Sequence, residues 1–221
     1  MLLDRKRVKF WQKWVFGFMA VIMALFLVMI PINRYVGCGN SASSALEQID
    51  KEITKYKTQT TTDPTNVDAW LSLAESYQLR ANQRAEGSAA QKADWLAAVA
   101  AYKAADKILR KVKGAAAKQQ RIDSLQQLAG VYLNMQDYPS ATGVYQKITG
   151  LRPKDAQSFF DLGTVAINAG DKQTALLAFT RFLELDPTSP DAGAVQDWIT
   201  SQTAPPSPSP SPTASASGSP Q

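Results

Sequence analysis

The sequence predicts an all-α protein: an N-terminal transmembrane helix, then an α-solenoid of about three helix pairs with a C-terminal capping helix. Residues 122–187 contain the same pattern twice, offset by 34 residues, and a fixed period of this length is typical of a repeat architecture. Within each copy, apolar residues recur at helical spacing. Each copy ends in a turn marked by a proline, Pro153 or Pro187, because proline does not continue a helix interior.

The N-terminal part of the chain predicts a membrane anchor. Residues 15–32 contain no charged side chain, and as a helix they are about 27 Å long, close to the thickness of the hydrocarbon core. Residues 1–14 carry +4 of the total net charge of +5. Since basic segments stay in the cytoplasm, we expect a single-pass protein in the cell membrane with residues 1–14 cytoplasmic and the repeats extracytoplasmic.

Two other interpretations of this segment remain open. A cleaved signal peptide usually has a shorter apolar core of about 7–15 residues. A lipoprotein signal would attach its lipid at Cys38; Gly37 before it fits that pattern, whereas Arg34 and Tyr35 do not. All three interpretations place the repeats outside the cytoplasm.

A linker and a helix precede the repeats. Residues 33–44 are mostly small and polar and read as the linker. Residues 45–62 are predicted to be helical, with Ser44 as N-cap and Glu47 completing a capping box. This helix is either a half-repeat that covers the end of the stack or a coiled-coil stalk, which needs more heptads than are present.

The repeat domain spans residues 64–201, and its first repeat, residues 64–113, contains an insertion. The pattern large–Leu–small–aromatic is carried there by Trp70, Leu73, Ala74 and Tyr77. Trp70 lies 55 residues before Leu125, which is 21 more than one repeat, and part of the excess lies in residues 82–92.

The second helix of this first repeat is predicted to be long. Ser88 is its expected N-cap and Gly114 its expected end. Trp95 lies on an added N-terminal turn, where it either packs in the core or contacts a partner.

The second and third repeats span residues 119–153 and 154–187. In each, a small residue follows the Leu of the first helix, Ala129 in one and Gly163 in the other, and allows the second helix to approach closely. A cap helix is predicted at residues 191–201, where Val195 and Trp198 close the apolar edge of the stack. The Pro/Ser-rich tail, residues 203–221, has little to bury and is predicted to be disordered.

At these residues the sequence resembles the tetratricopeptide repeat family. The resemblance implies that the domain binds segments of other proteins along a concave face lined by the first helices. Residue-by-residue matching places this groove at Asp68, Leu71, Glu75 and Gln78 in the first repeat, at Asp123, Gln126, Gly130, Leu133 and Asn134 in the second, and at Gln157, Phe160, Thr164, Ile167 and Asn168 in the third.

The matched positions suggest how a partner would be held. Asn134 and Asn168 occupy equivalent places, where amides can bond an extended backbone. Leu133, Phe160 and Ile167 are expected to form apolar pockets, although each is also an ordinary helix-surface position. Family members that clamp a chaperone's C-terminal carboxylate carry Lys and Asn where this chain has Leu71 and Glu75, which argues against that ligand.

Composition excludes several kinds of site. The chain has one Cys and no His, so it has no CxxC pair, no Cys/His cluster for zinc, and none of the commonest general base. We therefore predict no cofactor and no catalytic site. Beyond residue 14 the net charge is only +1, so nucleic acid is not an expected partner.

The leading hypothesis is a membrane-anchored adaptor that binds a protein or peptide at the membrane surface. The resemblance extends to anchored repeat proteins that assist cytochrome c maturation, secretion or envelope assembly. A structural spacer that holds envelope components off the membrane is one alternative. A regulatory subunit of an envelope enzyme is another, with chemistry resting on Asp68, Glu75 or Asp123, whose spacing shows no catalytic pattern.

Overall fold

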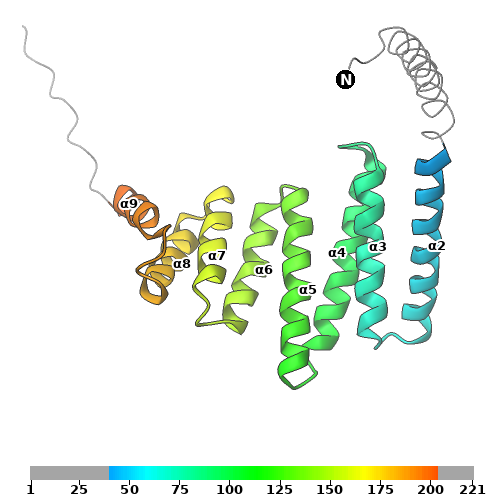
Figure 1. Cartoon of the computed structure of the whole chain (residues 1–221), viewed down its shortest axis with the longest axis horizontal. Helices are drawn as coiled ribbons and strands as arrows, with labels where there is room; N and C mark the ends of the chain where they lie inside the picture. The colour runs from blue at the N-terminus through cyan, green and yellow to red at the C-terminus, as the bar shows by residue number, and fades with distance from the viewer. Residues whose placement is uncertain (1–39, 204–221) are drawn as a thin grey trace, which may run out of the picture. The chain divides into compact units, whose positions relative to one another are not determined.

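The computed structural model describes residues 40–203, and its helices confirm the all-α class. In the described part of the chain there are eight helices and no strand: α2 (Asn40–Thr62), α3 (Val67–Gln83), α4 (Ala89–Leu109), α5 (Ala115–Asn134), α6 (Tyr138–Leu151), α7 (Ala156–Asn168), α8 (Lys172–Leu185) and α9 (Ala192–Thr203). Figure 1 labels them in chain order. They form two compact units, which divide between Ile108 and Leu109.

The predicted transmembrane helix at residues 15–32 lies outside the described residues, as does nearly all of the predicted tail. No helix among residues 40–203 has the length and apolar character needed to cross a bilayer.

In the first unit, α2 packs along α3. Ile53 and Thr60 of α2 are buried, with exposed fractions of 4% and 5%. The helix begins at Asn40, so Ser44 lies inside it and the prediction that Ser44 is the N-cap was wrong. The physical reason is that residues 40–44 contain neither Gly nor Pro, so nothing in them stops the helix from extending upstream of Ser44. These five residues, predicted to be linker, are therefore helical.

Side-chain N-caps begin both α3 and α4, the two helices of the first repeat. Asn66 caps α3 by accepting a hydrogen bond from the backbone N–H of Ala69 at 3.0 Å. Ser88 caps α4 as predicted, since its hydroxyl accepts from the backbone N–H of Gln91 at 3.1 Å. Trp95 is 6% exposed, which places it in the core rather than on a contact surface.

The sequence analysis expected Gly114 to end α4, and this prediction was wrong. The helix stops at Leu109, and Gly114 stands five residues later, immediately before α5. Its φ of 121° is a conformation that side-chain-bearing residues rarely adopt. The glycine therefore redirects the chain into α5, and the charged residues before it form the connection.

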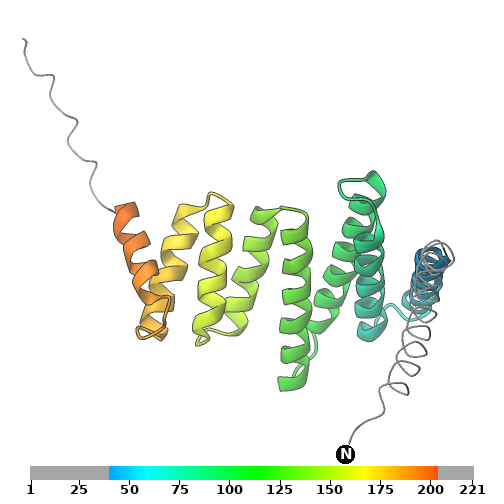
Figure 2. The ribbon, with the colours of Figure 1, turned by 45° about the horizontal axis from the view of Figure 1, so that its top comes forward.

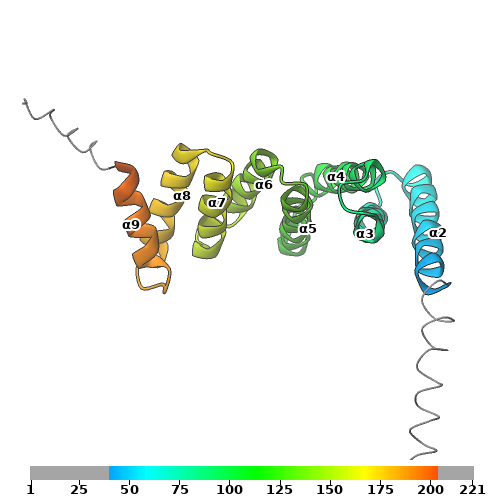
Figure 3. The same cartoon turned by 90° about the horizontal axis from the view of Figure 1, so that it is seen from above.

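The second unit contains two helix hairpins, α5–α6 and α7–α8, followed by α9 packed on α8. Figure 2 shows α5 to α8 standing side by side in chain order. Seen from above, α5 and α7 lie in one layer and α6 and α8 in the other (Figure 3). The second helix of each hairpin is capped in the same way: Asp137 accepts from the N–H of Ser140, and Asp171 from the N–H of Thr174.

The small residues act as predicted. Ala129 is fully buried, and a Cβ added to Gly163 would lie closer than 3.0 Å to the ring of Phe179 on α8. Phe179 is also in edge-on contact with Trp198 of α9, with ring centroids 5.2 Å apart. Val195 is 4% exposed in the same cluster, so α9 covers the apolar end of the second unit.

Candidate partner-binding surfaces

The first helices of the second unit present an exposed polar face, which we call the α5–α7 face. It consists of the predicted residues Asp123, Gln126, Gly130, Leu133 and Asn134 on α5 and Gln157, Thr164, Ile167 and Asn168 on α7. Leu133 and Gly130 are half-buried and the others are exposed. Ile167 is 39% exposed. The structure thus leaves the predicted residues of both helices accessible, and α5 and α7 share a layer.

Hydrogen bonds along each helix orient some of these side chains. Gln119 donates to the carboxylate of Asp123 at 2.7 Å, one turn later on α5. On α7, Gln157 donates to Asp161 at 2.8 Å. Asp161 is half-buried, and burial raises its pKa above the usual value, against the opposing effect of the bond from Gln157.

Phe160 differs from the other predicted groove residues because it belongs to the core cluster. Its ring lies 5.3 Å from that of Phe182 and 6.0 Å from that of Phe179, and it is half-buried. A substitution at Phe160 would therefore change packing as well as any contact with a partner.

The predicted groove residues of the first unit lie on α3. Asp68 and Glu75 are exposed, whereas Leu71 and Gln78 are half-buried. The hydroxyl of Tyr102 on α4 donates to the side-chain oxygen of Gln78 at 3.1 Å. Burial raises the pKa of Tyr102, and the charge of Glu75 adds to that effect. Gln78 is thus fixed to α4, which reduces its freedom to meet a ligand.

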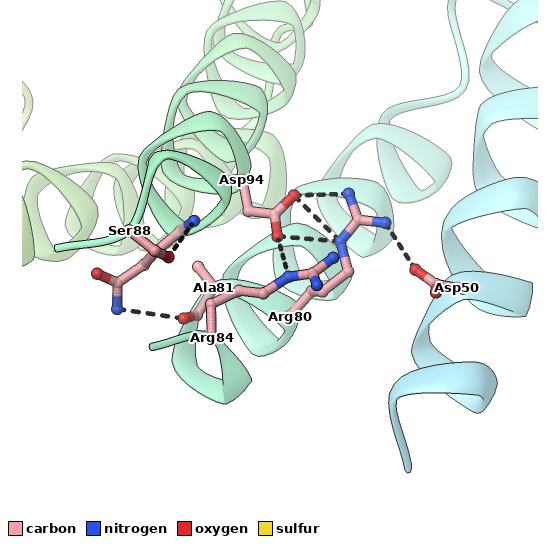
Figure 4. Close-up of polar contacts among 7 residues, drawn as sticks. Asp50, Arg80, Ala81, Arg84, Ser88 and Asp94 are labelled. Atoms are coloured by element: carbon pink, nitrogen blue, oxygen red, sulfur yellow. Dashed lines mark hydrogen bonds and ion pairs between the residues drawn. The ribbon is translucent and has the colours of Figure 1, made fainter. Parts of the chain in front are cut away.

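An ionic cluster that the sequence analysis missed joins the three helices of the first unit (Figure 4). Arg80 of α3 forms ion pairs of 2.6 Å with Asp94 of α4 and with Asp50 of α2, and Arg84 lies 3.4 Å from Asp94. Asp94 is only 4% exposed. The hydrogen bonds to Asp94 hold the pKa of Arg80 above its usual value, against the effect of its partial burial.

This cluster has no sequence signature, since Arg80 is 14 residues from Asp94 and 30 from Asp50, far outside the spacing of helical ion pairs. Its carboxylates are occupied by arginines, so the geometry fits a structural role: it fastens α2 to the α3–α4 hairpin.

A hollow of about 210 Å³ lies in the second unit, between α6 and the turn that joins α7 to α8. It is lined by Pro139, Thr142, Gly143, Gln146, Ala169 and Asp171. Asp171 is already engaged, because it accepts from both the N–H and the hydroxyl of Thr174. Residues 40–203 contain no group of three or more His, Cys, Asp or Glu side chains able to hold a metal ion.

Residues 128–200 match a family model described as tetratricopeptide repeat. The matched segment runs from the last two turns of α5 into α9, so it includes most of the second unit's two hairpins and most of its cap helix. The match supports the tetratricopeptide repeat family for this part of the chain.

The solved structures that match this chain share little sequence with it. One match is the crystal structure of MamA, whose sequence is 17% identical to this chain. The match covers 76% of this chain and 85% of the MamA chain, with a TM-score of 0.46. For the hetero-tetramer Cut9–Hcn1 of APC/C the identity is 13%, the coverage 80% and 45%, and the TM-score 0.39. For YrrB, described as a TPR protein with an unusual peptide-binding site, these values are 14%, 78% and 97%, and 0.30. No curated protein sequence matches the chain.

Proposed function

We propose that this chain is a membrane-anchored, non-enzymatic scaffold that binds a segment of another protein through the α5–α7 face, on the extracytoplasmic side of the membrane. The tetratricopeptide repeat match supports the general part of this proposal, because proteins of that family typically serve as protein-binding scaffolds.

The main support for the proposal is that both first helices of the second unit end in an apolar residue followed by an asparagine. Leu133 and Asn134 end α5, and Ile167 and Asn168 end α7. Both asparagines are exposed, and each amide can donate and accept a hydrogen bond with a partner's backbone. The adjacent Leu and Ile offer apolar contact next to the amides. A pair of equivalent contact points, one per repeat, suits an extended segment that crosses both helices.

The charge of the face indicates what kind of segment it accepts. None of the residues that define the α5–α7 face is a lysine or arginine, and Asp123 is its one acidic member. Asp161 lies beside it, half-buried. A free C-terminal carboxylate would find no cation there, so we propose a neutral or basic internal segment as the ligand.

The anchor is proposed from residues 15–32. Helix α2 begins at Asn40, eight residues after Ile32 at the end of that segment, so an anchor would keep the repeats close to the bilayer. Confinement of this kind raises the effective concentration of the face toward other proteins of the same membrane. Digestion of intact cells with an external protease tests the orientation: we expect loss of residues 40–203, and full protection would contradict it.

The binding proposal is tested by co-purification from crosslinked, intact membranes. The full chain is compared with the double variant Asn134→Ala/Asn168→Ala and with Ile167→Ala. The matched control is Leu177→Ala, because Leu177 is 68% exposed on α8, in the other layer. We expect a defined polypeptide with the unaltered chain and the control, and about ten-fold less with the double variant, the loss of about 1.4 kcal/mol of binding energy.

Equal recovery from all variants would refute the α5–α7 face as the binding site. Recovery of no defined polypeptide from any of them is what a structural spacer predicts, and only changes in the length of the chain would then affect its function.

A further inference from the structure

The connection between α4 and α5, together with the start of α5, is strongly basic. Residues 110–121 contain five cations and no acidic residue: Arg110, Lys111, Lys113, Lys118 and Arg121. The whole chain beyond residue 14 has a net charge of only +1, so this +5 segment is a local concentration of charge that the overall sum conceals. All of it lies in the second unit.

The segment is open to solvent. Arg110, Lys111, Lys113 and Lys118 are exposed, and Val112 between them is 50% exposed. The three lysines have no acidic partner among the described residues. The first turn of α5 contains no acidic residue, and Gly114 provides no side-chain cap, so the positive end of the helix dipole adds to the lysine charges.

We propose that residues 110–121 form a second interaction surface that binds an acidic segment of a partner protein. Carboxylates spaced along an extended chain would pair with the lysine ammonium groups, and Val112 would contact an apolar residue among them. This surface shares no residue with the α5–α7 face, and its positive charge selects an acidic segment rather than a neutral or basic one.

Two other polyanions fit the structure less well. A single-stranded nucleic acid usually stacks its bases on aromatic side chains, and residues 110–121 contain none. A segment that lies on an anionic lipid surface usually buries a large apolar face, and residues 110–121 contain only one large apolar residue, Val112.

The test uses the full-length protein in neutral detergent and a fluorescent ten-residue peptide of alternating Glu and Gly, followed by fluorescence anisotropy. The test variant is Lys111→Gln/Lys113→Gln/Lys118→Gln. The control variant is Lys147→Gln/Lys154→Gln/Lys172→Gln, which removes the same charge from three exposed lysines elsewhere in the second unit. Both variants should melt at the same temperature as the unaltered chain, which establishes that the fold is unchanged.

We expect the test variant to bind the peptide about ten-fold more weakly and the control less than two-fold, because each exposed ion pair changes affinity by about two-fold or more. Equal weakening in both variants would mean that net charge alone attracts the peptide, and would overturn the proposal. It would also be overturned if a twelve-nucleotide DNA or mixed micelles with anionic phospholipid bound more tightly than the peptide. The peptide-binding result does not depend on the co-purification test of the α5–α7 face, so a failure of that test would not change it.

Discussion

The closeness of α7 and α8 rests on the missing side chain of Gly163. A Cβ there would meet three ring atoms of Phe179 at less than 3.0 Å, and Phe179 is 4% exposed in the core, with little room to move. Gly130, at a helix-interior position of α5, is the matched control, because a Cβ added to it would have nothing within 4 Å. The two substitutions Gly163→Ala and Gly130→Ala therefore differ mainly in the packing they meet.

The expected magnitudes follow from two opposing effects. Replacing Gly by Ala inside a helix stabilises it by about 1 kcal/mol. Forcing an extra methyl group into a packed core costs about 1–3 kcal/mol. Gly130→Ala should therefore stabilise the protein by about 1 kcal/mol, whereas Gly163→Ala should be between neutral and about 2 kcal/mol destabilising.

Urea denaturation followed by far-UV circular dichroism measures both free energies of unfolding. A double variant, Gly163→Ala/Phe179→Leu, adds a direct test: because the smaller Leu makes room for the methyl group, we expect a favourable coupling of about 1 kcal/mol. If Gly163→Ala stabilises as much as Gly130→Ala, or if the coupling is zero, α7 and α8 are not held as close as described.

Three further predictions concern other parts of the structure. Asp94→Ala should lower the free energy of unfolding by about 3 kcal/mol, because it leaves Arg80 partly buried without its main partner, whereas Asp50→Ala should change it by less than about 1 kcal/mol, since Asp50 is exposed; urea titrations distinguish the two. Asp161→Asn should raise the melting temperature at pH 7 and leave it unchanged below about pH 4. The raised pKa of Asp161 means that the folded protein favours the protonated carboxyl, so the unaltered chain loses stability as pH rises from the usual range of aspartate through that raised pKa; an equal difference at both pH values would contradict this cause. Trp198→Ala should destabilise the second unit by about 2–3 kcal/mol through lost packing on Phe179, and hydrogen exchange should then increase in α9 and α8; unchanged exchange in α8 would show that α9 does not support it.

The sequence predicted the second unit well because its information is local. A 34-residue period, small residues at Ala129 and Gly163, and turn residues at fixed offsets all act within one hairpin, and they fixed α5 to α8 closely. Val195 was also placed correctly at the closing edge of the stack, whereas the sequence left Trp95 open between the core and a partner contact, and its burial decides for the core.

The first unit was harder to predict because its organisation depends on contacts that are distant in sequence. The Arg80–Asp94–Asp50 cluster joins three helices, and no pattern within one helix reveals it. Gly114 illustrates another limit: a glycine after a helix commonly ends it, but here its positive φ serves the start of the next helix. The basic residues 110–121 were overlooked because only the summed charge was considered.

The residues of the α5–α7 face were chosen by matching the sequence to the tetratricopeptide repeat pattern. The structure adds that most of their side chains are exposed to solvent. The structure also separates Phe160 from the rest of the set, since aromatic packing on Phe182 could not be foreseen from helical spacing.

The most direct measurement of the central claim is position-specific photo-crosslinking in living cells. A photoreactive phenylalanine analogue is placed one site at a time in the full chain, at Gln126 on α5, Thr164 on α7 and Leu177 on α8, all exposed. We expect a crosslink to the same polypeptide from positions 126 and 164 and none from position 177. Crosslinks from position 177 alone, or from all three positions alike, would contradict a partner seated on the first helices.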